Sequence, residues 1–95
     1  MPAYIICRVA VEGPSVLKAY QAVAPAIIEK YKGKFIVKGG ASVTLEGPPE
    51  SRIIVVLEFP ELVDAEAFYN SPENTEARKL REGLATFEFV ALQGL

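Results

Sequence analysis

The order in which strand-like and helix-like apolar patterns follow one another constrains the fold of this chain more than any other feature. Apolar residues alternate most clearly over residues 52–59, where Ile53, Val55, Leu57 and Phe59 share one face. This alternation is typical of a half-buried β-strand. Weaker versions of the pattern predict three further strands. The four predicted strands are residues 3–11, 34–46, 52–59 and 84–92.

A long helical pattern covers residues 15–31. Apolar side chains recur there at the spacing of an amphipathic helix. Pro25 lies inside this pattern and predicts a kink or a break, because proline removes a backbone hydrogen bond and crowds the preceding turn. Lys32-Gly33 predicts the end of the helix, since glycine tolerates positive φ. The predicted inner stripe is Val16, Tyr20, Val23 and Ile27, widened by Leu17, Ala24, Ile28 and Tyr31.

A second helical region follows the third strand. Pro60 ends that strand, and an apolar stripe begins at Leu62 and includes Ala65, Phe68 and Tyr69. Ser71-Pro72 then predicts a new helix, with serine as the cap and proline in the first turn. This helix is predicted to run to about Glu82, with Ala77 and Leu80 facing inward, and Gly83 to close it.

Glycine and proline mark the segment between the second and third strands. Gly39-Gly40 lies in the middle of the predicted second strand, which indicates a β-bulge or the close approach of another group. Residues 47–50 (GPPE) have the composition of a turn. The second and third strands are therefore expected to form a hairpin.

The predicted order is strand, helix, strand, strand, helix, strand. With right-handed crossovers, this order gives an α+β fold of the ferredoxin-like βαββαβ type. Its four-stranded antiparallel sheet would carry both helices on one face. The chain has 95 residues and no linker or repeat, so residues 1–95 are expected to form a single domain.

The other face of such a sheet would be open and apolar. Simple alternation places there Tyr4, Ile6, Ile36, Ile54, Val56 and Val90, together with Arg8, Lys38, Glu58, Thr86 and Glu88. An exposed apolar patch of this size usually marks an interface. We therefore expect a homodimer in which two subunits pack these faces together around a two-fold axis and pair the charges.

Composition excludes several classes of function. The chain contains no histidine and one cysteine, so imidazole-based catalytic triads, disulfides and thiolate-rich metal sites are excluded, and we expect no metal. A net charge of −2 provides no electrostatic footprint for nucleic acid. No apolar run is long enough to span a membrane, and the N-terminus does not resemble an export signal. A cytoplasmic location is expected, with Cys7 buried as a small apolar residue.

Several segments together resemble the DUF1330 family of small proteins of uncharacterised function. They are Tyr20, Pro25, YKGKF (residues 31–35), VKGG (37–40), EG (46–47), LEFP (57–60), FYNSPE (68–73), Arg78 and Arg81. The resemblance covers nearly the whole chain and implies the dimeric α/β-barrel fold. The family more often has two glycines where this chain has Lys32-Gly33. The resemblance implies no established reaction.

Lys38, Gly39 and Gly40 are the first candidate site residues. The glycines would let a ligand approach the backbone, and Lys38 would supply a cation for a carboxylate, enolate or phenolate. The alternative is a structural bulge, with Lys38 paired at the dimer face. Arg8 and Glu58 are the other catalytic candidates, as a cation and a general base flanking a polar pocket. They are otherwise an ion pair at the interface.

The tyrosines and a basic cluster are candidates for ligand binding. Tyr20, Tyr31 and Tyr69 lie on apolar helical stripes, where tyrosine is usually a core residue with its hydroxyl at the rim. One of them, Tyr20 or Tyr69 in particular, would line a cavity between helices and sheet, where relatives of this fold bind small substrates. Arg78, Lys79 and Arg81 indicate a solvated helix face, and anion binding is the alternative, which would involve Arg81.

Three functions remain open from the sequence. The first is an enzyme without a bound cofactor, of the monooxygenase, isomerase or lyase type, acting on a small aromatic or carbonyl compound. It requires a cavity reached by Lys38 or Tyr20. The second is a non-enzymatic module that binds or senses a small ligand. The third, RNA binding, requires exposed stacked aromatic residues, and the open face offers only Tyr4.

Overall fold

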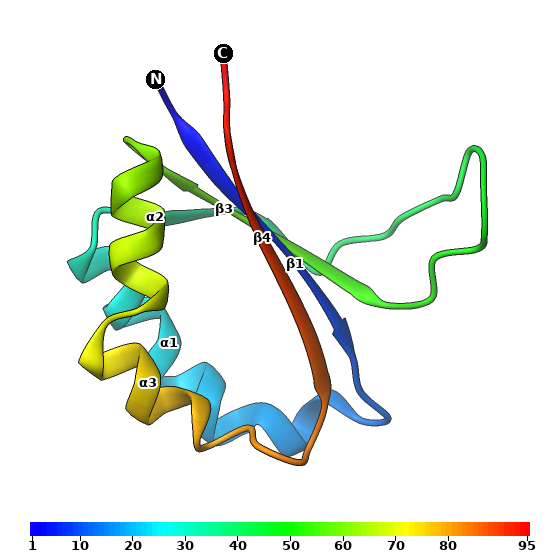
Figure 1. Cartoon of the computed structure of the whole chain (residues 1–95). Helices are drawn as coiled ribbons and strands as arrows, with labels where there is room; N and C mark the ends of the chain where they lie inside the picture. Colours follow the sequence, from blue (N-terminus) through cyan, green and yellow to red (C-terminus); the bar gives the residue numbers. More distant parts are fainter.

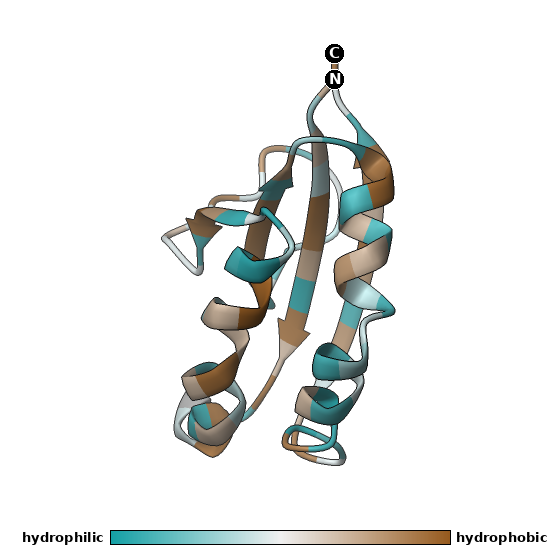
Figure 2. Cartoon of the chain, turned by 90° about the vertical axis from the view of Figure 1, so that its left-hand side faces the viewer, coloured by the Kyte–Doolittle hydropathy of each residue, from teal (hydrophilic) through white to brown (hydrophobic). Residues whose placement is uncertain are grey.

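A computed structural model describes the backbone of residues 1–95 and all side chains except that of Pro14. The elements are β1 (Ala3–Ala10), the 3₁₀ helix η1 (Pro14–Leu17), α1 (Lys18–Lys30), β2 (Lys34–Lys38), β3 (Ile53–Phe59), α2 (Leu62–Tyr69), α3 (Pro72–Arg78) and β4 (Thr86–Gln93). The strands form one sheet in the order β2-β3-β1-β4, and each neighbouring pair is antiparallel. The helices cover one face of this sheet (Figure 1, Figure 2). The predicted ferredoxin-like α+β fold is confirmed.

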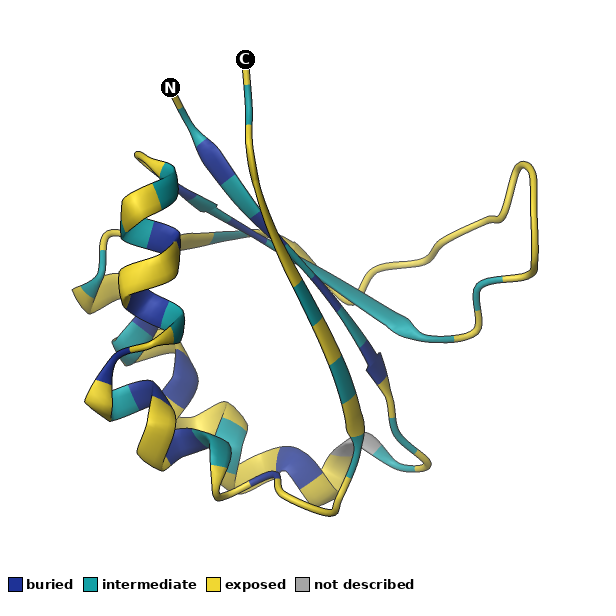
Figure 3. Cartoon of the chain, viewed as in Figure 1, coloured by how far each residue is buried: buried dark blue, intermediate teal, exposed yellow. Residues whose placement is uncertain are grey.

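The core lies between this helical layer and the sheet, and β1 runs through its middle. Odd-numbered residues of β1 are buried and face the helices, as the alternation predicts (Figure 3). Ile5 packs with Leu57 and Phe59 of β3 and with Phe68 of α2. Cys7 belongs to a second apolar cluster and is buried, which confirms its predicted position.

The second strand is shorter than predicted and contains a bulge in another place. β2 ends at Lys38, so Gly39-Gly40 follows the strand, and residues 39–52 form a loop instead of a tight hairpin. The pairing with β3 shifts between Phe35 and Val37. A bulge turns the following residues to the opposite face. Lys38 therefore pairs with Val55 and lies on the helix side, and its predicted position on the open face is wrong.

The first helix continues through Pro25 without a break. The buried face of this helical segment differs from the predicted one. Leu17, Ala24 and Ile28 are buried, whereas Val16 and Val23 of the predicted inner stripe are exposed. The proline lacks a donor, but its pyrrolidine ring contributes apolar surface to the cavity described below.

The end of α1 also differs from the prediction. Lys32 has φ 71°, a left-handed conformation expected of the following glycine. Gly33 is required for another reason: a Cβ there would lie 2.5 Å from the Phe59 ring and 2.8 Å from Ile28. Close packing, and not backbone freedom, explains Gly33.

The last helix ends earlier than the sequence suggests. Ser71 caps α3 by accepting a hydrogen bond from the Asn74 N–H at 3.1 Å, as predicted. The helix then stops at Arg78, not near Glu82, and successive turns follow. Their hydrogen bonds span three residues, as in Arg81 N–H to the Arg78 carbonyl. These turns bury Arg81 and leave Leu80 exposed, the reverse of the predicted arrangement.

Candidate functional site

A cavity of about 380 Å³ lies between α1 and the helix-facing side of the sheet. This volume is within the usual range for sites that bind small molecules. The lining, taken over the described side chains, is mostly apolar and contains no carboxylate. It consists of Cys7, Val9, Leu17, Tyr20, Gln21, Ala24, Pro25, Ile28, Phe35, Lys38, Gly39, Ile53, Val55, Leu57, Phe68, Phe87 and Phe89. We call this space the α1 cavity.

Lys38 and Gly39 belong to this cavity, but Gly40 does not. The Lys38 ammonium lies 4.5 Å from the centre of the Phe35 ring, a cation–π contact within the lining. Gly39 has φ 70°, and a Cβ there would meet Ile53 at 3.2 Å. Gly40 is exposed, with open space around it. The structure thus separates the two glycines that the sequence groups together.

Cys7 and Tyr20, which carry one thiol and one hydroxyl group, line the same cavity. Burial raises the pKa of the Cys7 thiol to about 11, and burial likewise raises the pKa of the Tyr20 hydroxyl. In both cases the nearby Arg81 guanidinium opposes the rise in pKa. At neutral pH both groups therefore keep their protons and act as hydrogen-bond donors, not as bases.

A second cavity, of about 310 Å³, lies between α2 and β4. It shares the rings of Phe87 and Phe89 with the α1 cavity. Tyr69 lines it, with its ring centre 5.3 Å from that of Phe89 and its hydroxyl accepting a hydrogen bond from Arg78 at 3.0 Å. The full lining is Ile5, Ala65, Glu66, Tyr69, Asn70, Arg81, Phe87, Phe89 and Ala91. We call this space the β4 cavity.

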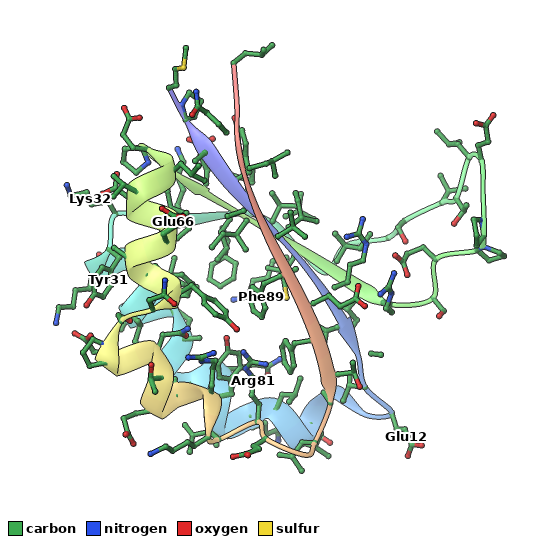
Figure 4. All side chains as sticks on the ribbon, in the orientation of Figure 1. Glu12, Tyr31, Lys32, Glu66, Arg81 and Phe89 are labelled. Carbon is green, nitrogen blue, oxygen red and sulfur yellow. The ribbon has the colours of Figure 1, made fainter. Side chains whose placement is uncertain are left out.

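Arg81 lies between the helices and the sheet (Figure 4), where it lines the β4 cavity and contacts three rings of the α1 cavity lining, those of Tyr20, Phe87 and Phe89. Its side chain points into the space between the helices and the sheet, near Phe89, and the residue is only 8% exposed. The guanidinium carbon lies 3.8 Å from the centre of the Phe87 ring and 5.0 Å from that of Tyr20. The solvated helix face predicted for this residue is wrong, because the turns after α3 direct it inward.

Arg8 and Glu58 lie on the open face and do not pair with each other. Arg8 donates to Glu50 at 3.2 Å, and Glu58 lies 3.6 Å from the Lys34 ammonium. They are on the opposite side of the sheet from Lys38, so these three candidates do not form one site.

Glu50 is a residue whose role sequence reasoning missed. Hydrogen bonds from Arg52, and one from Arg8, lower the pKa of Glu50 to about 2. Arg52 also bonds Glu88 at 2.7 Å, which completes a charged network on the open face. Glu50 lies in a segment whose composition indicated only a turn. The position of Glu66 in the lining of the β4 cavity was missed as well. Nothing in its sequence spacing distinguishes it from an exposed carboxylate on a helix.

Two observations concern metals and membranes. The described residues include no group of three or more His, Cys, Asp or Glu side chains placed to hold a metal ion. Within the same part of the chain, no helix is both long and apolar enough to cross a bilayer.

Comparison with solved structures shows the same fold in proteins of low sequence identity. A protein of unknown function from Rhodopseudomonas palustris, RPA0582, has a TM-score of 0.73 and 20% identity, over 99% of this chain and 82% of its own. SnoaB, a cofactor-independent oxygenase from Streptomyces nogalater, has a TM-score of 0.69 and 14% identity, over 99% and 93%.

A third similar structure is described as dimeric. This ferredoxin-like protein of unknown function from Bacteroides fragilis has a TM-score of 0.62 and 16% identity, over 98% of this chain and 96% of its own.

A search of the curated proteins finds no match. The family model DUF1330, a domain of unknown function, matches residues 2–95. The chain therefore belongs to the DUF1330 family, as its motifs indicate.

Proposed function

We propose that this protein is a cofactor-independent enzyme of the monooxygenase, isomerase or lyase type. Its substrate would be a small aromatic or carbonyl compound bound in the α1 cavity. One observation carries the proposal: Lys38 and Tyr20 both line a mostly apolar cavity, whose other polar lining residues are Cys7 and Gln21. The enzyme hypothesis requires a cavity of this kind, and a solidly packed core would have excluded the hypothesis.

The chemistry suited to this lining involves a developing oxyanion. Each of the three reaction types, when it starts from loss of a proton by a phenol or next to a carbonyl group, passes through a phenolate or enolate, whose negative oxygen needs a cation or a hydrogen-bond donor. Lys38 supplies a cation, and Tyr20 supplies a hydroxyl that burial keeps protonated. The Tyr20 hydroxyl acts more strongly in this apolar surrounding than in water, whereas Lys38 is exposed and approaches the ligand from the rim of the cavity. Since the described lining holds no carboxylate base, the favoured substrates are compounds acidic enough to ionise readily.

The likeness to SnoaB supports this proposal at the level of fold. That protein is a cofactor-independent oxygenase and covers nearly the whole of this chain at 14% identity. The similarity shows that this fold is compatible with cofactor-independent oxygenation, and it assigns no substrate to the present chain.

The direct test is turnover without any added cofactor. Purified protein is incubated with a panel of phenols, naphthols and β-dicarbonyl compounds, and products and oxygen consumption are measured. Lys38→Met and Tyr20→Phe are each expected to lower kcat by about a hundredfold, the lower end of the usual cost of losing one oxyanion donor. Lys18→Met, on the exposed start of α1, is the matched control and should leave kcat unchanged. Equal rates in all variants would contradict the proposal.

Non-enzymatic binding is the second candidate function. It is favoured by the described lining of the α1 cavity, which includes no carboxylate that could act as a general base. Compounds that raise the melting temperature but are recovered unchanged would support this function over the enzyme.

We also propose that the protein is a homodimer joined through the open face of the sheet. Val37, which pairs with Val56, and Val90, which pairs with Ile6, are exposed there, alongside a charged network. This network consists of Arg8, Glu50, Arg52 and Glu88. The loop of residues 39–52 projects on the side away from the helices (Figure 1) and exposes Val43 and Leu45. Apolar side chains on a projecting loop are suited to contact a second copy.

Sedimentation of the wild type at micromolar concentration is expected to give twice the monomer mass. Val56→Asp places a charge in the middle of the open face and should produce monomers. Val63→Asp, on the exposed side of α2, is the matched control and should remain dimeric. A monomeric wild type would contradict the proposal.

A further inference from the structure

We infer that Arg81 is an anion-binding group and that the ligand of this protein carries a carboxylate on a small aromatic or similarly apolar ring. The inference rests on the proposed binding function of the cavities and names the substrate class more narrowly. It depends on the burial of Arg81, on its unused hydrogen-bonding capacity and on the rings around it.

The first step is that Arg81 is buried without a counter-charge. Its Nε is inaccessible to solvent and has no hydrogen-bond partner among the described side chains. No described carboxylate lies within ion-pair distance of the guanidinium, in contrast to Arg8 and Arg52. Glu66 lines the β4 cavity together with Arg81 but forms no such pair. A buried cation in this condition is costly unless something else neutralises it.

The second step is that the aromatic contacts do not replace an anion. The guanidinium carbon lies 3.8 Å from the centre of the Phe87 ring, 5.0 Å from that of Tyr20 and 5.3 Å from that of Phe89. Cation–π contacts offset part of the desolvation cost. They leave the Nε–H unsatisfied, however, since a ring face accepts no strong hydrogen bond from it.

The third step concerns the shape and chemistry of the missing partner. Arg81 borders the β4 cavity, and the rings of Phe87 and Phe89 also wall the α1 cavity. These apolar walls fit an aromatic ring, and the planar guanidinium matches a carboxylate that accepts in-plane hydrogen bonds. A ring that bears a carboxylate satisfies both requirements at once.

Arg78 is not an equivalent site, although its Nε is also unsatisfied. Its guanidinium donates to the Tyr69 hydroxyl at 3.0 Å and to Thr75 at 3.4 Å, and it is only partly buried. Arg78 therefore has two hydrogen-bonded partners and access to solvent, whereas Arg81 is only 8% exposed and has the Tyr20 hydroxyl beside it but no anion among the described side chains.

The test compares benzoate with benzamide, which have nearly the same shape but different charge. Binding is followed at neutral pH by chemical-shift titration of the full chain, including the Arg81 Nε–H resonance. We expect benzoate to bind about tenfold more tightly than benzamide and to shift that resonance, since a hydrogen bond to a charged group is worth about this factor. Arg81→Met should abolish the preference, whereas Lys79→Met, an exposed neighbour with the same loss of charge, should retain it.

A second readout separates ligand binding from a structural role. Replacing an uncompensated buried charge by an apolar side chain of similar length is expected to leave the melting temperature of the ligand-free protein equal or higher. A purely structural Arg81 would instead give a lower melting temperature and an unchanged benzoate preference, which would overturn the inference. Should Arg81→Met fail to fold, Arg81→Lys, which keeps the charge but lacks the planar Nε–H group, is expected to show a reduced preference.

The outcomes also distinguish this inference from the function on which it rests. Equal affinity of the wild type for benzoate and benzamide would overturn the role of Arg81 and leave the cavity as a binding site. Absence of binding by both compounds and by the whole panel of phenols and dicarbonyls would overturn both proposals.

Discussion

The Lys38 ammonium lies over the Phe35 ring, 4.5 Å from its centre, although the two residues are three apart in one strand. In a regular strand, residues with an odd separation point to opposite faces of the sheet. The bulge between Phe35 and Val37 removes this alternation and brings both side chains to the helix side. The position of the candidate catalytic lysine therefore depends on one irregularity in β2.

The buried thiol of Cys7 is expected to react slowly. Burial raises its pKa to about 11 from an ordinary 9.0, so at pH 8 its thiolate is about a hundred times rarer than in an unfolded chain. Labelling with iodoacetamide, with and without urea, measures this difference. Equal rates in the folded and unfolded protein would contradict the predicted burial.

The same thiol makes folding stability depend on pH in the alkaline range. Because the folded pKa is above the unfolded one, its contribution is full below about pH 9 and decreases as the pH rises toward 11. Urea unfolding of the wild type and of Cys7→Ala at several pH values tests this sign. The free energy of unfolding of Cys7→Ala should decrease less between pH 9 and pH 11 than that of the wild type. Equal decreases in the two proteins would contradict the prediction.

Glu73 is expected to stabilise the contact between α1 and α3 at neutral pH. Hydrogen bonds from Lys30 and Tyr31 lower its pKa to about 2, and the Tyr31 hydroxyl donates at 2.8 Å. Its contribution is therefore present above about pH 4.5 and lost as the pH falls toward 2.

Glu73→Gln should be less stable than the wild type at pH 7, and the difference should disappear at low pH. Glu76→Gln is the control, because Glu76 forms only an exposed pair with Lys79. A difference between wild type and Glu73→Gln that stays constant from pH 7 to pH 2 would be incompatible with the lowered pKa.

Gly33 is expected to tolerate no side chain. The Cβ of Gly33→Ala would lie 2.5 Å from the Phe59 ring, and Phe59 is itself fully buried. Overpacking of this kind costs about 1–3 kcal/mol of unfolding free energy. Gly13→Ala is the control, since a Cβ there meets no atom within 4 Å, and it should change stability by less than about 0.5 kcal/mol. Urea unfolding of both variants distinguishes packing at Gly33 from a general effect of losing glycine.

Lys32→Gly is expected to stabilise the protein by about 0.5–1 kcal/mol, because Lys32 adopts φ 71°, which only glycine adopts without strain. The Lys32–Asp64 pair that it removes is long, at 3.9 Å, and the lysine is exposed, so the loss is small. Lys32→Ala removes the same pair but keeps the strain and should give no gain. A melting temperature of Lys32→Gly below that of Lys32→Ala would contradict the argument.

Sequence alone determined the order of elements, the helix-facing side of β1 and β3, the burial of Cys7 and the apolar character of the open face. These features depend on periodicity and capping, which act between near neighbours in the chain. The family was recognisable from motifs for the same reason.

Only the tertiary structure decided which polar residues reach the cavities. A bulge turns Lys38 toward α1, and the turns after α3 turn Arg81 toward Phe87. The same structure keeps Arg8 and Glu58 on the opposite face. The change at Lys38 depends on the bulge, because one extra residue in a strand moves the residues after it to the opposite face. The change at Arg81 depends on the end of α3, where turns replace the helical periodicity. Prediction from regular periodicity contains neither irregularity.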